Sequence, residues 1–266
     1  MARTAANWLR SPDRLAALAL RLRRMLAVER PLRIAGSRLV LGAETFTELH
    51  RARAVGETWT ADWVRGLPAG AVLWDVGANV GVFTLLAAES PSVARVVAIE
   101  PAFLNYAALM RNVLRNGLSA KVIALPVGLG ETTGALAFNL QNLKAGDSMH
   151  SFGAIFPLRD RTTAPAATMS VLCYRLDDLV RVPGLPFPTH LKLDIDGLEE
   201  SVLRGGRATL ADPRLVGLQV EVMDLAADLP RRRSVVALLE GLGWRLAETI
   251  PHASAAPIIA DLRFGR

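Results

Sequence analysis

The stretch Val72-Leu-Trp-Asp-Val-Gly-Ala-Asn-Val-Gly-Val-Phe-Thr-Leu-Leu-Ala-Ala88 decides the fold. It starts as a short apolar run, passes through a glycine-containing turn, and then takes up the apolar spacing of a helix. The order strand, tight turn and helix is how an α/β protein brings its backbone close to a ligand. The stretch therefore predicts a nucleotide-like ligand, with candidate contacts at Asp75, Gly77, Ala78, Asn79 and Gly81.

A second signal follows about one strand and helix later. The run Arg95-Val-Val-Ala-Ile99 is typical of a buried strand, and it ends in Glu100-Pro101. An acidic residue at the end of the second strand is placed to accept hydrogen bonds from both ribose hydroxyls of an adenosine. The first turn lacks the Gly-x-Gly-x-x-Gly pattern of dinucleotide enzymes, so an oxidoreductase is the weaker alternative.

Four landmarks occur in a fixed order along the chain: the glycine loop, Glu100-Pro101 with Asn105-Tyr106, Leu176-Asp-Asp178, and Lys192-Leu-Asp-Ile-Asp-Gly197. From about residue 57 to 221 this set resembles FkbM-type S-adenosylmethionine-dependent methyltransferases of the class I superfamily. The resemblance implies a Rossmann-like fold, S-adenosylmethionine as cofactor and methyl transfer to a hydroxyl oxygen. It also implies further cofactor contacts at Pro101, Asn105, Val127 and Gly128.

The order of apolar runs predicts an α/β architecture. Parallel strands need crossover helices, which cover both faces of the sheet. With the resemblance, we expect seven strands, mostly parallel, and an antiparallel last strand. Residues 1–66 are interpreted as a helical accessory extension and 67–266 as the methyltransferase domain. Within that domain, residues 131–188 are expected to insert a hairpin and a lid that binds the methyl acceptor.

Acidic residues gather where later strands end. Asp194 follows one apolar run, Asp196 lies just beyond it, and Glu221 ends the next run. The carboxyl ends of parallel strands share one crevice, so these side chains are expected near Glu100. A hydroxyl acceptor benefits from a base that removes its proton. The candidates, in order of preference, are Asp196, Glu221, Asp194 and the lid residue His150.

Asp194 has two further roles to consider, as a cofactor contact and as a partner for Lys192. No Cys/His cluster has zinc spacing, and no metal ligand is assigned. A Mg²⁺ ion held by Asp194, Asp196 and Glu221 remains an alternative way to activate a sugar diol. Loss of activity on chelation would distinguish the two mechanisms.

The net charge of +6 is confined to the start of the chain. Residues 1–34 hold eight arginines against two acidic residues, so the remainder is close to neutral and a nucleic-acid partner is not expected. Residues 11–30 predict a basic amphipathic helix. Such a helix could contact an anionic membrane surface, or it could pack on the domain or on a second subunit of a homo-oligomer.

The remaining composition favours a soluble cytoplasmic protein, with peripheral contact at the inner face of the membrane left open. The longest apolar run is far shorter than the roughly 18 residues of a membrane span. Cys173 is the single cysteine and is expected to be a buried structural thiol. The expected acceptor is a hydroxyl of a sugar, a glycolipid or polysaccharide precursor, or a polyketide-like metabolite. The alternative is a non-catalytic S-adenosylmethionine-binding or membrane-associated partner protein of the same fold.

Overall fold

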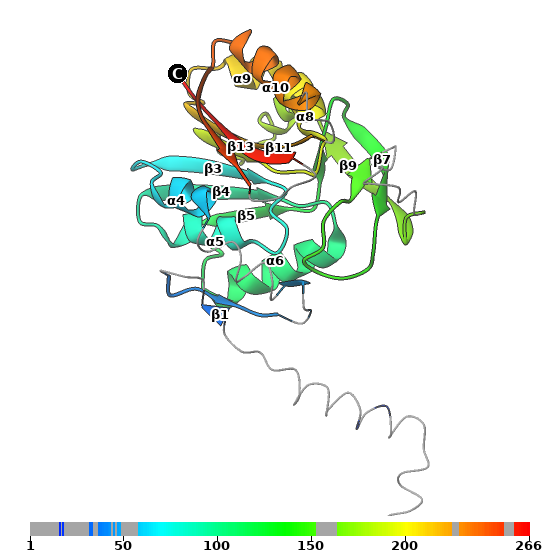
Figure 1. Cartoon of the computed structure of the whole chain (residues 1–266). Helices are drawn as coiled ribbons and strands as arrows, with labels where there is room; N and C mark the ends of the chain where they lie inside the picture. The colour runs from blue at the N-terminus through cyan, green and yellow to red at the C-terminus, as the bar shows by residue number, and fades with distance from the viewer. Residues whose placement is uncertain are drawn as a thin grey trace, which may run out of the picture.

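A computed structural model describes residues 58–152, 164–224, 229–252 and 258–266, with positions 16, 18, 32–33, 37–43, 45 and 47–48 before them. Its centre is a seven-stranded sheet in the order β12-β13-β11-β10-β3-β4-β5 (Figure 1). The strands are β3 (Ala71–Val76), β4 (Val93–Ile99), β5 (Val122–Leu125), β10 (His190–Leu193), β11 (Gly217–Asp224), β12 (Arg245–Pro251) and β13 (Ile258–Gly265).

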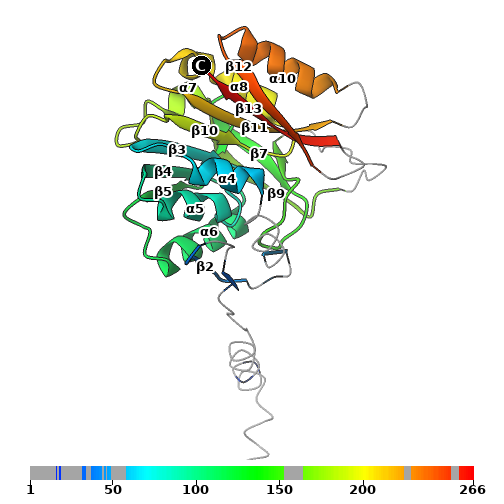
Figure 2. The same cartoon turned by 60° about the vertical axis from the view of Figure 1, so that its left-hand side comes forward.

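The pairing directions confirm the predicted sheet. Strands β5, β4, β3, β10 and β11 pair in parallel. Strand β13 inserts between β11 and β12 and runs antiparallel to both. Figure 2 shows β12 and β13 at one edge of the sheet, with β5 at the other. The chain therefore has the mixed sheet of a Rossmann-like class I methyltransferase fold.

Helices cover both faces of the sheet because its strands are apolar on both sides. Consecutive residues of β3 and β4 enter two different cores, with Leu73, Val96 and Ala98 in one and Trp74, Val97 and Ile99 in the other. The first core is closed by α4 (Trp59–Arg65), α5 (Val82–Glu89) and α6 (Phe103–Arg115). The second is closed by α7 (Leu176–Leu179), α8 (Glu199–Gly205), α9 (Arg207–Ala211) and α10 (Pro230–Glu240).

A second, smaller sheet interrupts the alternation between β5 and β10. It consists of β6 (Gly128–Leu129), β7 (Gly134–Leu140), β8 (Ser151–Phe152) and β9 (Ala167–Tyr174), in the order β6-β9-β7-β8. Strands β7 and β9 form the antiparallel hairpin that the sequence predicts. Cys173 is buried in β9, and burial raises the pKa of its thiol to about 11, as expected of a structural cysteine. Residues 153–163 of the predicted lid lie outside the described residues.

The start of the chain is described only in short pieces. Strands β1 (Leu32–Arg33) and β2 (Val40–Leu41) form an antiparallel pair. The side chains of Asn116 and Asn112 accept the N–H groups of Val40 and Gly42 at 2.8 and 3.0 Å, which attaches β2 to the end of α6. The predicted basic helix over residues 11–30, with its membrane and oligomer contacts, lies outside the described residues apart from positions 16 and 18. Among the described helices, none combines the length and the apolar character that crossing a bilayer requires.

Candidate active site

The glycine loop begins where β3 ends against two neighbouring strands. Gly77 has φ +79°, and the N–H groups of Gly77 and Ala78 both donate to the Ile99 carbonyl, at 3.0 and 3.1 Å. A Cβ atom on Gly77 would collide with the backbone carbonyl of Asp194. Only glycine tolerates both the positive φ and this close approach. The loop therefore holds the ends of β3, β4 and the segment after β10 together.

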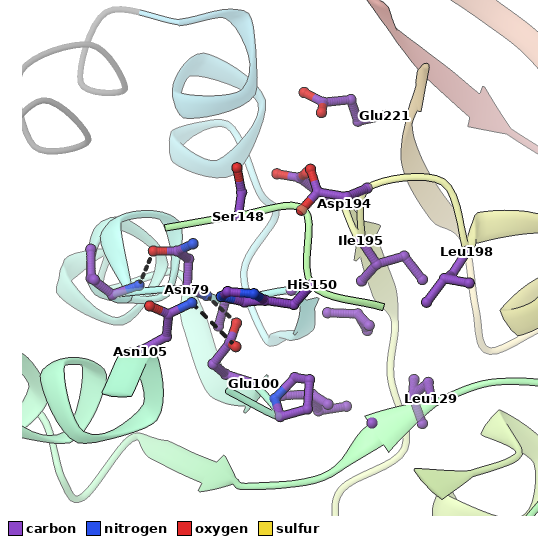
Figure 3. A pocket seen from close by; sticks show the side chains of 18 of the residues that line it. Asn79, Glu100, Asn105, Leu129, Ser148, His150, Asp194, Ile195, Leu198 and Glu221 are labelled. Atoms are coloured by element: carbon purple, nitrogen blue, oxygen red, sulfur yellow. Dashed lines mark hydrogen bonds between the residues drawn. The ribbon is translucent and has the colours of Figure 1, made fainter. Parts of the chain in front are cut away.

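A pocket of about 960 Å³, including its open mouth, lies over these strand ends. Figure 3 shows the carboxylates of Asp194 and Glu221 on one side of the pocket and Glu100 with the two asparagines on the other. The structure brings these predicted residues together at the pocket wall: Gly77, Ala78, Asn79, Glu100, Pro101, Asn105, Gly128, His150, Asp194, Asp196 and Glu221.

Asp75 lies next to the pocket but not in its wall. It is fully buried behind the pocket wall and does not line the pocket. Its Oδ2 accepts the hydroxyl of Thr84 at 2.6 Å, and its Oδ1 lies 3.4 Å from Nζ of Lys192. Because a strand reverses its side-chain direction at every residue, the last positions of β3 do not all face the ligand. Asp75 therefore supports the site from within the core.

Gly81 and Val127, which were also predicted as cofactor contacts, do not line the pocket either. Gly81 precedes α5 with φ +92°, and a Cβ there would collide with the side chain of Leu109 on α6. Its role is therefore to let two helices pack closely. Val127 packs into the second core instead. Of the segment after β5, it is the next residue, Gly128, that reaches the pocket.

Glu100 is held in a backbone cradle at the end of β4. Its Oε2 accepts the N–H of Asn79 at 2.8 Å, and its Oε1 accepts the N–H of Ala102 at 2.9 Å. Asn105 Nδ2 is 3.5 Å from the same Oε1. Burial raises the pKa of Glu100 to about 7 despite these bonds. Oε2 can accept a second hydrogen bond, so Glu100 keeps acceptor capacity for a ligand.

Residues 146–150 form the described part of the lid next to the pocket. The side-chain amides of Asn79 and Asn105 both donate to the carbonyl of Asp147, at 2.9 and 3.0 Å. The N–H of Met149 donates to Oδ2 of Asp196 at 2.6 Å, and Met149 has φ +66°. The lid is thus tied to the glycine loop, to α6 and to the segment after β10. Asp147, Ser148 and His150 line the pocket.

His150 has a geometry that argues against its predicted role as a base. Its Nδ1 accepts the N–H of Gln141 at 3.2 Å, and its ring packs edge-on against Phe138. Burial lowers the pKa of His150, which favours the neutral ring. A neutral imidazole has one acceptor nitrogen, and Gln141 already occupies it. Nε2 then carries the proton, so His150 can donate a hydrogen bond and cannot accept a proton there.

Lys192 is the central cation of the site. Its Nζ lies 3.0 Å from Oδ2 of Asp194 and 3.4 Å from Oδ1 of Asp75. Strand β10 ends at Leu193, which lets Asp194 turn back to this partner, as the sequence requires for the predicted pair. Burial alone lowers the pKa of Lys192, but the charges of Asp194 and Asp75 outweigh it and raise the pKa above its usual value.

Glu221 reaches the pocket for a different reason than the sequence suggests. Strand β11 continues to Asp224, so Glu221 does not end it. The neighbouring β10 stops at Leu193, which pairs with Val220, and Glu221 is therefore the first residue of β11 beyond that shorter strand. Burial, followed by the charges of Asp194 and Asp261, raises the pKa of Glu221 well above its usual value.

Most of the apolar wall of the pocket was not predicted from the sequence. Two of these residues, Val76 and Ile99, end strands directly before ligand loops, and that position is a signal that could have found them. Several more come from the small sheet and from the turn after β10, whose placement no local pattern fixes. The missed apolar residues include Leu129, Phe138, Phe152, Ile195 and Leu198.

Glu199, at the start of α8, shapes the turn after β10 without lining the pocket. Its Oε1 accepts the N–H groups of Gly197 and Ile195, at 2.8 and 3.3 Å. The turn needs this support because Asp196 and Gly197 have φ +54° and +99°. Burial raises the pKa of Glu199 from 4.5 to about 7. The native state therefore binds the Glu199 proton more tightly than the unfolded state does.

We expect Glu199→Gln to remove a pH dependence of stability. The contribution of Glu199 is fully present below about pH 4.5 and is lost as the pH rises through about 7, whereas glutamine does not titrate. From about pH 5 to pH 8 the free energy of unfolding of the parent should fall relative to the variant by up to about 3 kcal/mol. Urea denaturation at both pH values measures this difference. Glu200→Gln is the control, because Arg204 lowers the pKa of Glu200. An equal difference at both pH values would contradict the account.

The sheet order and the pocket at its carboxyl edge define a class I methyltransferase architecture. The Methyltransferase FkbM domain family matches residues 75–243. The chain belongs to the FkbM methyltransferase family. Among solved structures, a methyltransferase FkbM from Methylobacillus flagellatus superposes with a TM-score of 0.51 at 16% identity, over 74% of this chain and 44% of that one.

Curated relatives are methyltransferases as well. The chain is 29% identical over 162 residues to methyltransferase sdnD of Sordaria araneosa, and the aligned region covers 53% of this chain and 62% of that protein. It is 26% identical over 149 residues to the hexuronic acid methyltransferase AglP of Haloferax volcanii, which covers 56% of this chain and 55% of that protein. The matched part of the chain thus spans less than two thirds of either relative.

Proposed function

We propose that this chain transfers a methyl group from S-adenosylmethionine to a hydroxyl oxygen of a sugar, a glycolipid or polysaccharide precursor, or a polyketide-like metabolite. The observation that carries the proposal is the position of Glu100. Glu100 directly follows β4, and its carboxylate lines the pocket beside the glycine loop. An acid at this point of an open α/β sheet is suited to the two hydroxyls of a ribose.

The charge and shape of the pocket support this cofactor. S-adenosylmethionine carries a sulfonium and an ammonium group, and the rim opposite Glu100 carries the carboxylates of Asp194 and Glu221, while Asp196 also lines the pocket. Opposite charges that face each other in a partly dry site attract more strongly than they do in water. The apolar residues Ile99 and Leu129 offer a surface for the adenine base.

Methyl transfer needs alignment and a base. The acceptor oxygen forms a bond to the methyl carbon while the carbon–sulfur bond breaks and its electron pair passes to sulfur. The hydroxyl proton must leave to a nearby acceptor. Glu221 suits this role because burial raises its pKa above that of an ordinary carboxylate, which makes it a stronger base. Asp194 is held by Lys192 at 3.0 Å, and Asp196 accepts the N–H of Met149 at 2.6 Å. Glu221 therefore replaces Asp196 as the preferred base.

The acceptor class rests on relatives. AglP is named as a hexuronic acid methyltransferase, which favours a sugar acceptor. The pocket residues Asn79 and Ser148 can donate hydrogen bonds to a polyol or accept them from it, and His150 can donate one. The acidic rim disfavours an acceptor whose carboxylate or phosphate approaches Glu221 directly, since like charges repel. We therefore place any acidic group of the acceptor at the pocket mouth, away from β11.

The proposal is tested by incubating the purified protein with methyl-tritiated S-adenosylmethionine and one candidate acceptor at a time. The acceptors are methyl glycosides of neutral hexoses, of deoxyhexoses and of uronic acids, and a polyketide alcohol. The expected result is label in one acceptor class that survives mild alkali, as a methyl ether does and a carboxyl ester does not. Activity should persist in EDTA, because the proposed base needs no metal. Alkali-labile label would contradict hydroxyl methylation. Cofactor binding without transfer to any class would favour the non-catalytic alternative, and tight NAD binding instead of S-adenosylmethionine binding would favour an oxidoreductase.

A further inference from the structure

A histidine that the sequence analysis did not single out lies between two carboxylates next to the pocket. His252 follows the end of β12, and its backbone N–H donates to the Ile259 carbonyl of β13 at 2.9 Å. Its Nε2 lies 3.1 Å from Oδ2 of Asp261, and its Nδ1 lies 3.8 Å from Oε2 of Glu221. Both ring nitrogens therefore face an acidic side chain, and one of these side chains lines the pocket.

The two carboxylates are neighbours because of the sheet register. Glu221 on β11 and Asp261 on β13 are directly opposite each other in an antiparallel pair. Like charges in directly opposite positions destabilise a sheet unless a cation lies between them. Protonated His252 supplies such a cation, hydrogen-bonded to Asp261 through Nε2 and at an ion-pair distance of 3.8 Å from Glu221 through Nδ1. The arrangement thus explains why an acid pair is tolerated at this point.

A series of buried side-chain hydrogen bonds holds Asp261 in place. Oδ2 of Asp261 accepts the hydroxyl of Thr60, on α4, at 3.1 Å. The side-chain amide of Gln219 in turn donates to the oxygen of that hydroxyl. Asp261, Thr60 and Gln219 are all at most 5% exposed, whereas the side chain of His252 is 35% exposed. Asp261 is therefore the rigid anchor, and His252 is the member that exchanges protons with solvent.

We propose that His252, held by Asp261, is a positioning residue whose positive charge keeps Glu221 in the carboxylate form that accepts the acceptor proton. This inference rests on the proposed function. Glu221 needs such help, because burial and three nearby carboxylates all favour its protonated form. The hydrogen bond that His252 donates to Asp261 raises the pKa of His252 and so extends its cationic range toward neutral pH. The charged groups that act on Glu221 and His252 are Lys192, Asp194, Asp196 and Asp261.

The rate profile against pH tests this role in four proteins: the parent, His252→Gln, His252→Lys and Asp261→Asn. Loss of the cation should move the acidic limb of kcat/KM to higher pH in His252→Gln, by on the order of one pH unit for partly exposed charges. His252→Lys keeps a cation, so its acidic limb should return toward the parent position. Asp261→Asn weakens the cation but also removes a carboxylate that itself raises the pKa of Glu221, so its acidic limb should move less than that of His252→Gln. Calorimetry with S-adenosylmethionine reports whether each variant keeps an intact pocket.

Imidazole ¹⁵N NMR provides a readout that needs no catalysis. The pKa of His252 should lie above that of free histidine and should fall in both Asp261→Asn and Glu221→Gln. If the pKa of His252 falls in both variants but the protein transfers no methyl group, the proposed function is contradicted and the link between His252 and the two carboxylates still holds. Methyl transfer with an unshifted acidic limb in His252→Gln, or with equal shifts in the Gln and Lys variants, would overturn the inference alone. The inference would also be overturned if EDTA abolished the activity of the parent and Mn²⁺ restored it. That result would favour a cation bound by Glu221, His252 and Asp261.

Discussion

Glu221→Gln is expected to lower kcat by a factor of about 10² to 10⁴, the usual contribution of a general base. Glutamine has nearly the same shape but cannot take the acceptor proton near neutral pH. The change also removes one carboxylate from a rim that repels its own charges, so the fold should tolerate it. Single-turnover methyl transfer measures the chemical step, and calorimetry measures S-adenosylmethionine binding, which should change by no more than about tenfold.

The matched control is Glu248→Gln. Glu248 lies on β12 with its side chain 46% exposed and pairs with Arg263 at 2.8 Å, outside the pocket. This variant should retain parental kcat. If Glu221→Gln lowers kcat less than about threefold, a base other than Glu221 accepts the proton. Asp196→Asn and Asp194→Asn would then identify that base.

Lys192→Met should lower the free energy of unfolding by about 3 to 5 kcal/mol, the typical cost of removing one partner of a buried ion pair. Methionine fills a similar volume, so the cost is electrostatic. Asp75 is fully buried, and its Oδ1 accepts no hydrogen bond, so Lys192 is the group that balances this charge. Urea denaturation near neutral pH measures the loss.

Two further variants separate this effect from a loss of packing. Asp75→Asn combined with Lys192→Met removes both charges and should recover a large part of the stability, because no uncompensated buried carboxylate remains. Lys144→Met, at an exposed position in the lid, should change stability by no more than about 0.5 kcal/mol. A loss of under about 1 kcal/mol in Lys192→Met would contradict the central role of this cation.

Much of the fold could be predicted because it depends on local patterns. Continuous apolar runs mark strands that are buried on both faces, and Leu73 and Trp74 do enter opposite cores. Gly77 has the positive φ that its place after a strand requires. The acids Glu100 and Asp194 follow strand ends, and they come together because the carboxyl ends of parallel strands lie at the same edge of the sheet. These features need no knowledge of distant contacts.

The rest of the site depends on strand register and on contacts far apart in the chain. Asp75 faces the core because of the way β3 is oriented in the sheet, and the residues 71–75 do not encode that orientation. Phe138 and Phe152 reach the pocket through the pairing of β7 with β8. His252 and Asp261 join Glu221 only because β13 pairs antiparallel with β11 in one register. A one-residue shift would turn Asp261 to the other face of the sheet.

The central claim is that the carboxyl edge of the sheet binds the adenosyl sulfonium between the glycine loop and the acidic rim. A crystal structure with S-adenosylhomocysteine, the demethylated product, tests it most directly. The account predicts the ribose hydroxyls at hydrogen-bonding distance from the carboxylate of Glu100, with the sulfur facing the side of the pocket that carries Glu221. A nucleoside bound elsewhere, or one whose sulfur faces away from Glu221, would contradict it.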